Sequence, residues 1–109
     1  MIDLSTLNRL ALDGTDVVLR PVFDPSLRTF SVQLWENDEI RAVHGAVGEF
    51  LLADEPVAFI DDFLAEQGVR ATTGDEAALL YAGLIWAEGG KGADLLRMGN
   101  QAAEPGQQD

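Results

Sequence analysis

The sequence predicts an α+β fold in which helices pack on a small three-stranded antiparallel sheet, in the order α-β-β-β-α-α. Two observations carry this prediction. Residues 15–44 hold three short segments that are rich in β-branched and aromatic residues and are separated by turn formers, as is typical of strands. Residues 54–88 hold two longer segments with apolar residues at helical spacing and recognisable helix ends.

The chain has the size and composition of one domain. Of its 109 residues, we expect residues 1–99 to form the domain and the polar residues 100–109 to be a disordered tail. Cysteine is absent, which excludes disulfides and thiolate metal sites and is compatible with a cytoplasmic protein. No signal peptide is recognisable, and the longest apolar stretch, 77–87, is about half the roughly 20 residues that a membrane helix needs. We therefore expect no membrane contact.

The first half is expected to hold one helix and a three-stranded meander. The helix is predicted near residues 3–13, because Leu4, Leu7, Leu10 and Ala11 fall at helical spacing before Asp13-Gly14. The strands are predicted at 15–23, 28–35 and 39–44. Within the second strand, Phe30, Val32 and Leu34 should face the core. Pro21 indicates that the first strand lies at a sheet edge or carries a bulge.

Two clear helices are expected in the second half. The first begins at Asp54 as its cap, has the apolar stripe Val57, Ile60, Phe63 and Leu64, and ends at Gly68. The second begins with the capping box of Thr73 and Glu76 and ends at Gly89-Gly90. A short last helix is expected at 93–98. Residues 45–53 are ambiguous, because Gly45 and Gly48 interrupt a helix and Phe50-Leu51-Leu52 fit either a short strand or a buried lead-in.

The charge of the chain is unusual. Nineteen acidic and seven basic residues give a formal net charge of −12. Residues 42–90 contain nine of the acids and one base, Arg70, so the excess is concentrated there. A field of this sign repels nucleic acid and anionic membranes and attracts basic surfaces. We therefore expect no direct binding to nucleic acid, which usually needs clustered Lys and Arg.

No catalytic, cofactor or metal site is predicted. The single histidine, His44, is interpreted as structural or exposed, with acid–base catalysis as the alternative. The Gly89-Gly90-Lys91-Gly92 segment lacks the first glycine and the hydroxyl residue of a phosphate loop and follows a helix. Asp61-Asp62 and the acids of residues 36–39 offer oxygen ligands, but neither group has a metal-binding spacing.

The predicted helix from Asp54 to Glu66 is the strongest candidate for a binding surface, because it carries five acids and no base. Glu55, Asp62 and Glu66 are spaced to share the face opposite the apolar stripe. Glu36, Asp38 and Glu39 form a second predicted acidic patch. These six residues are the predicted partner contacts. The other reading of the acidity is that it serves solubility alone.

In size and acidity the chain is similar to the small inhibitors of phages and mobile elements, including anti-CRISPR and anti-restriction proteins, although no motif carries this resemblance. The leading hypothesis is a non-enzymatic inhibitor or adaptor that binds a basic surface of a nucleic-acid-handling protein. The alternative is a structural or assembly protein, such as a phage morphogenesis factor or a homo-oligomer, with an apolar interface that could include Trp35. A third hypothesis is an enzyme or ligand binder with a pocket at His44.

Overall fold

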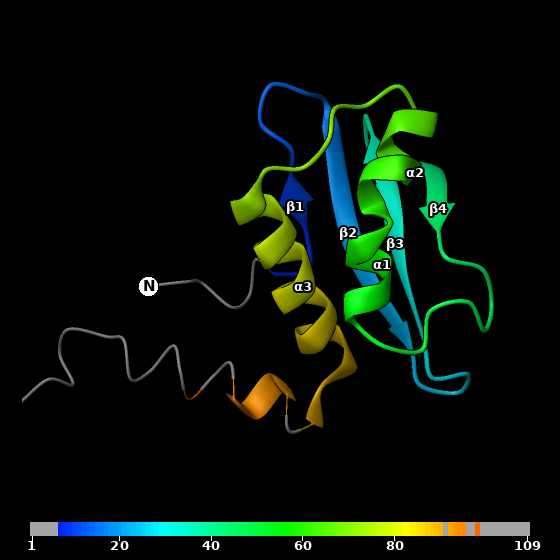
Figure 1. The fold of residues 1–109 in the computed structure, drawn as a ribbon, viewed down its shortest axis with the longest axis vertical. Coiled ribbons are helices and arrows are strands. Elements are labelled where there is room, and N and C mark those ends of the chain that lie inside the picture. The colour runs from blue at the N-terminus through cyan, green and yellow to red at the C-terminus, as the bar shows by residue number, and fades with distance from the viewer. Residues whose placement is uncertain (1–6, 91, 96–97, 99–109) are drawn as a thin grey trace, which may run out of the picture.

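The computed structural model describes residues 7–90, 92–95 and 98 and has an α+β fold with one antiparallel sheet (Figure 1). The sheet contains four strands in the spatial order β1-β2-β3-β4, so each strand lies beside its neighbours in sequence. Three helices follow the strands. The elements are β1 (Leu10–Ala11), β2 (Val17–Asp24), β3 (Thr29–Glu36), β4 (Glu39–His44), α1 (Asp54–Ala58), α2 (Ile60–Glu66) and α3 (Gly74–Glu88).

The prediction of an initial helix and three strands was wrong. Leu10 and Ala11 form β1, which pairs with Leu19 and Val18 of β2, and the part of the predicted helix before residue 7 lies outside the described residues. The leucines that fit a helical spacing also alternate by two at Leu10 and Leu12, and Leu12 is fully buried. The free edge of β2 offers hydrogen-bond partners to Leu10 and Ala11, which a helix at this position would not use. Pairing with β2 therefore outweighs the local preference of these residues for a helix.

The other three strands were predicted within two residues of their ends. In β3, Phe30, Val32 and Leu34 are buried as expected. The β3–β4 hairpin turns through Asn37 and Asp38, which both have positive φ, as a two-residue hairpin of this kind requires. The pairing of β3 with β4 shifts by one residue between Leu34 and Trp35, so this hairpin contains a β-bulge.

Pro21 lies where β2 lacks a partner on one side. The short β1 covers only Val18 and Leu19, so no described strand requires the missing N–H of Pro21. Pro21 is buried and packs against α3 at Gly83. The predicted edge position was wrong, because β2 is an inner strand between β1 and β3, although the two-residue β1 does not extend to Pro21.

The single helix expected at residues 54–67 is divided at Phe59 into α1 and α2. Phe59 has φ −111° and ψ 7°, outside the helical region. The residue before α1 is Ala53, which makes no side-chain cap, so the predicted capping role of Asp54 was wrong. The predicted end is correct: Gly68 has positive φ, and Val69 N–H donates to the Leu64 carbonyl in the Schellman pattern.

Helix α3 begins as predicted. The Thr73 hydroxyl accepts from the Glu76 N–H at 3.1 Å, and the Glu76 carboxylate accepts from the Thr73 N–H at 2.9 Å. Residues 92–95 and 98 are helical, in line with part of the expected last helix, and the expected disordered tail lies outside the described residues. Residues 45–53 contain no strand and lead irregularly into α1. The expected buried lead-in is confirmed only at Phe50, since Leu51 and Leu52 are exposed.

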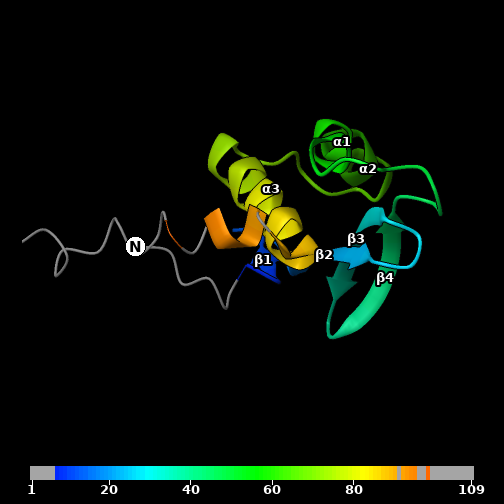
Figure 2. The ribbon, with the colours of Figure 1, turned by 90° about the horizontal axis from the view of Figure 1, so that it is seen from below.

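Helices α1, α2 and α3 lie on the same face of the sheet, and none of these three lies on the opposite face (Figure 2). Helix α3 packs on β1 and β2, whereas α1 contacts β3 (Figure 1). The core lies between these two layers. Its fully buried members come from both: Leu12, Leu19, Val32, Leu34, Ile60, Leu64, Leu80 and Leu84. This arrangement leaves the edge of β4 and the helix-free face of the sheet accessible.

Candidate functional site

The structure brings two of the six predicted contacts together in a hollow between the end of β4 and α2. Asp62 and Glu66, both exposed, lie one turn apart on α2 and line this hollow. Glu49, from the loop before α1, is a third carboxylate in its lining. We call this feature the acidic hollow. Its other lining residues are apolar or aromatic, apart from His44 and Gly45: Val43, Phe50, Phe59 and Phe63.

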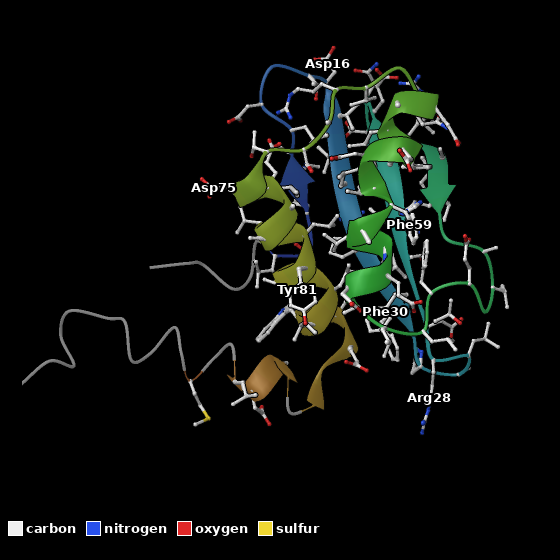
Figure 3. All side chains as sticks on the ribbon, viewed as in Figure 1. Asp16, Arg28, Phe30, Phe59, Asp75 and Tyr81 are labelled. Carbon is white, nitrogen blue, oxygen red and sulfur yellow. The ribbon has the colours of Figure 1, made fainter. Side chains whose placement is uncertain are left out.

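Aromatic side chains give the acidic hollow an apolar component. Phe59, at the junction of α1 and α2, is 54% exposed (Figure 3). Its ring stacks at 6.3 Å on the ring of Phe50, which is buried. Val43, at 52% exposure, adds an accessible methyl surface. An exposed aromatic ring beside carboxylates combines the two features that bind the cationic side chains of Arg and Lys.

His44 lines the acidic hollow but is largely buried. The ring is 8% exposed and packs against Phe63 and Phe50 at centroid distances of 4.8 and 4.9 Å. Its Nε2 lies 3.0 Å from the Pro56 carbonyl, to which a protonated Nε2 donates. Burial lowers the pKa of His44, outweighing the Pro56 hydrogen bond and the charges of Glu49 and Glu66, which raise it. The hollow required by the hypothesis of an enzyme or ligand binder is present, but Nε2 is already hydrogen-bonded.

Glu55, a predicted partner contact, forms hydrogen bonds within the fold. Its Oε1 accepts from the N–H groups of Leu51 and Leu52, both at 2.8 Å, and so satisfies backbone donors ahead of α1. The expected common face with Asp62 and Glu66 assumed one continuous helix, which Phe59 interrupts. Glu55 thus stabilises the segment before α1, and it is not among the residues that line the acidic hollow.

The predicted second patch lies at the β3–β4 hairpin, and its three acids have separate surroundings. Glu36 forms a salt bridge with Arg41 at 3.2 Å. Asp38, in the turn, lines a different hollow that also contains Arg9 and Arg20. Glu39 is exposed at the start of β4. Two of the three acids therefore lie close to arginines, which reduces the negative field of this patch.

Arg70, the one base of residues 42–90, forms its hydrogen bonds with other residues of the fold. Its guanidinium donates to both oxygens of Glu76, at 2.8 and 2.9 Å, and to the Asp13 carbonyl. Glu76 is nearly buried, and Arg70 lowers its pKa to about 2. This cation thus neutralises a capping carboxylate at α3. It is absent from the lining of the acidic hollow.

Two residues of the acidic hollow were missed by sequence reasoning. Glu49 falls in the irregular segment 45–53, where no periodicity indicates which way a side chain points. Phe59 did carry a signal, since it lies off the apolar stripe of Val57, Ile60, Phe63 and Leu64 and yet is aromatic. An aromatic residue on the polar side of a helix is expected to be exposed to solvent, as Phe59 is.

No group of three or more His, Cys, Asp or Glu side chains among the described residues is arranged to hold a metal ion. None of the described helices is long and apolar enough to cross a membrane. Comparisons with protein-family models, with curated proteins and with solved structures find no match for this chain. The fold and the site therefore define it only as an α+β domain with an acidic, partly aromatic hollow.

Proposed function

We propose that this protein is a non-enzymatic binding protein, an inhibitor or adaptor, that docks on a basic surface of a nucleic-acid-handling protein through the acidic hollow. The observation that carries the proposal is the convergence of three carboxylates with an exposed aromatic ring, Phe59. Inhibition of the anti-CRISPR or anti-restriction type is the specific form of this function that the size and acidity of the chain suggest.

The chemistry of the hollow favours an Arg or Lys side chain of the partner. Glu49, Asp62 and Glu66 supply anionic oxygens, which form charge-assisted hydrogen bonds with guanidinium or ammonium groups. The methylene stem of either cation would pack on Phe59 and Val43. A cation held over an aromatic ring adds about 0.5–2 kcal/mol, depending on how far it is desolvated.

The surrounding field supports the same partner. Residues 42–90 have a formal net charge of −8, and their one base is paired with Glu76. Such a field accelerates association with a basic surface and makes the rate sensitive to salt. Proteins that bind nucleic acid present such surfaces because they contact phosphates with Lys and Arg.

The proposal is tested by retention of partners from a lysate of the native host on three immobilised forms of the full chain. The forms are the wild type, the charge-reversed Asp62→Lys/Glu66→Lys variant, and a control with the same charge change, Asp75→Lys/Glu88→Lys. Both control residues are exposed and lie outside the acidic hollow. We expect the wild type and the control to retain the same basic protein, and the variant in the hollow to retain at least about tenfold less.

Salt and one further substitution complete the test. Raising the salt concentration should elute the retained protein, because exposed charges are screened over about 10 Å at 0.1 M. Phe59→Ala should weaken retention without changing net charge. Equal losses from the variant in the hollow and from the control would show that only overall acidity matters, and retention insensitive to all three changes would reject the proposal.

A homo-oligomer or assembly protein is the second candidate. It is favoured by the accessible edge strand β4, on which Ile40 and Val43 are each about half exposed. Exposed strand edges can pair with another chain. The net negative charge of the molecule opposes self-association at low salt. Measuring the mass of the protein in solution at low and high salt therefore distinguishes the two functions.

A further inference from the structure

A second hollow lies on the helix-free face of the sheet. Val18, Arg20 and Trp35 line it, and they alternate along β2 and β3 with the buried Val17, Leu19 and Leu34, so they point away from the helices. Asp16 and the hairpin residues Asn37 and Asp38 border it towards one end of the sheet. Arg9 completes its lining from the residue before β1. We call this feature the arginine hollow.

Arg20 is held in place by Trp35. Its guanidinium carbon lies 5.0 Å from the centre of the indole ring, within the range of a cation–π contact. The indole is itself fixed, since its N–H donates to Gln33 Oε1 at 3.0 Å. Stacking uses the flat face of a guanidinium and leaves the N–H groups on its edge available for hydrogen bonds. Arg20 is therefore a preorganised donor.

Arg9 and Arg20 both line the arginine hollow. They adjoin the last pair of the β1–β2 ladder, Leu10 with Leu19, so a continuation of this antiparallel ladder would set them opposite each other. Neither arginine forms a salt bridge with any residue that the structure describes, although the chain carries a net charge of −12. Like charges that face each other across strands are destabilising. An anion bound between the two guanidinium groups would remove this repulsion.

We infer that the arginine hollow binds a small ligand with an oxyanion, a carboxylate or a phosphate, on a compact polar body. Arg9 and Arg20 donate to the oxyanion, for which two guanidinium forks are well matched. Asp16, Asn37 and Asp38 accept hydrogen bonds from amino or hydroxyl groups of the same ligand.

The size and charge of the arginine hollow set limits on this ligand. Its volume of about 340 Å³ lies at the lower end of the range of about 300–1,000 Å³ for small-molecule sites. Asp16 and Asp38 in its lining, together with the net charge of the chain, disfavour a nucleic acid strand. This site is independent of the acidic hollow, so either proposal can fail without the other.

The test is an NMR titration of the full chain with four probes. Adenosine 5′-monophosphate and inorganic phosphate represent phosphates, L-glutamate represents carboxylates, and adenosine lacks an oxyanion. We expect saturable shifts of the Trp35 indole N–H and the Arg20 side-chain N–H with the phosphates or with L-glutamate, at a Kd of about 1 mM or below. The oxyanion that binds more tightly identifies the ligand class, and adenosine should produce no saturable shift.

Variants assign the binding to the two arginines. Arg9→Gln and Arg20→Gln should each weaken binding at least about tenfold, and Arg20→Lys should restore part of it. Arg28→Gln is the matched control, because Arg28 is exposed, has no described salt bridge and lies at the opposite end of the molecule from Asp16 (Figure 3). Its binding should equal that of the wild type.

Several outcomes would overturn the inference. No saturable shift with any of the three oxyanion probes up to about 10 mM would exclude a useful site. If Arg28→Gln weakened ligand binding as much as Arg9→Gln and Arg20→Gln, the effect would come from the overall charge of the protein and not from the arginine hollow. Shifts of the Trp35 indole that depend on protein concentration without a probe would show that a second copy of the chain covers this face.

Discussion

Glu76 joins three parts of the molecule at one carboxylate. It caps the first turn of α3 through Thr73 and accepts two hydrogen bonds from Arg70, which also holds the Asp13 carbonyl ahead of β2. The side chain of Glu76 is only 10% exposed, so water replaces these bonds poorly if they are lost. A single residue thus links the start of α3 to the sheet.

The pKa of Glu76 predicts how stability depends on pH. The pKa is lowered from 4.5 to about 2 in the folded state, chiefly by the hydrogen bonds from Arg70. A carboxyl group with a lowered pKa stabilises the fold above the unfolded pKa and loses this effect as pH falls through the folded one. The contribution of Glu76 should therefore be complete at pH 7 and decline between about pH 4.5 and 2.

Glu76→Gln removes the charge but keeps the shape. We expect it to lower the free energy of unfolding at pH 7 by about 2 kcal/mol, the scale of hydrogen bonds to a charged group, and to flatten the decline at acid pH. Urea denaturation at pH 7 and at acid pH measures both effects. Glu88→Gln, at an exposed position of α3, is the control, and a Glu76→Gln protein as stable as the wild type would contradict this account.

At the scale of elements, α3 packs closely against β2 and the segment before β1 at Gly83. A Cβ at this position would lie 2.5 Å from the Leu7 carbonyl oxygen and 2.8 Å from Cγ of Pro21. Both contacts are too short, and the first is with backbone that cannot rotate away. The glycine therefore allows the helix to cross β2 and the segment before β1.

Gly83→Ala tests this packing against helix propensity. Alanine in the middle of a helix is favoured over glycine by about 1 kcal/mol, whereas overpacking costs about 1–3 kcal/mol. We expect the clash to prevail and the midpoint of thermal unfolding to fall by several degrees. Gly74→Ala, where a Cβ meets nothing within 4 Å, should not destabilise the protein in the same way. A raised midpoint of thermal unfolding for Gly83→Ala would show that the close contacts at this position do not destabilise the alanine variant.

Helix ends explain which elements could be predicted. The capping box of Thr73 and Glu76 and the stop at Gly68 are local signals, and both hold in the structure. Phe59 has no such signal, so one continuous helix was predicted where two occur. The same interruption breaks the continuous helix on which Glu55 was expected to share a face with Asp62 and Glu66.

At the scale of the whole molecule, the helices cover one face of the sheet and leave β4 as an edge. The two proposed binding regions differ in sign. The acidic hollow lies between β4 and α2, and the arginine hollow lies on the helix-free face. Val43 lines the first hollow and pairs with Gln33, beside the strand position of Arg20.

The oligomeric state separates the two candidate functions. A binding protein that acts alone should have a mass of 11.8 kDa by light scattering at both low and high salt. A homo-oligomer should reach a multiple of this mass once salt screens the repulsion between copies of net charge −12. If it does, Val43→Lys on the accessible edge strand should restore the monomer, and a monomer at every salt concentration would reject the assembly function.

The local sequence determined the three long strands, the capped ends of α2 and α3, and the concentration of negative charge in residues 42–90. These features depend on alternation, turn residues and caps, which act over a few positions. Only the tertiary structure decided that Leu10–Ala11 would pair with β2, that Glu49 and Phe59 would join Asp62 and Glu66, and that Arg9 and Arg20 would line the same hollow. The reason is that these outcomes depend on contacts between segments distant in sequence, whose free energy outweighs local preference.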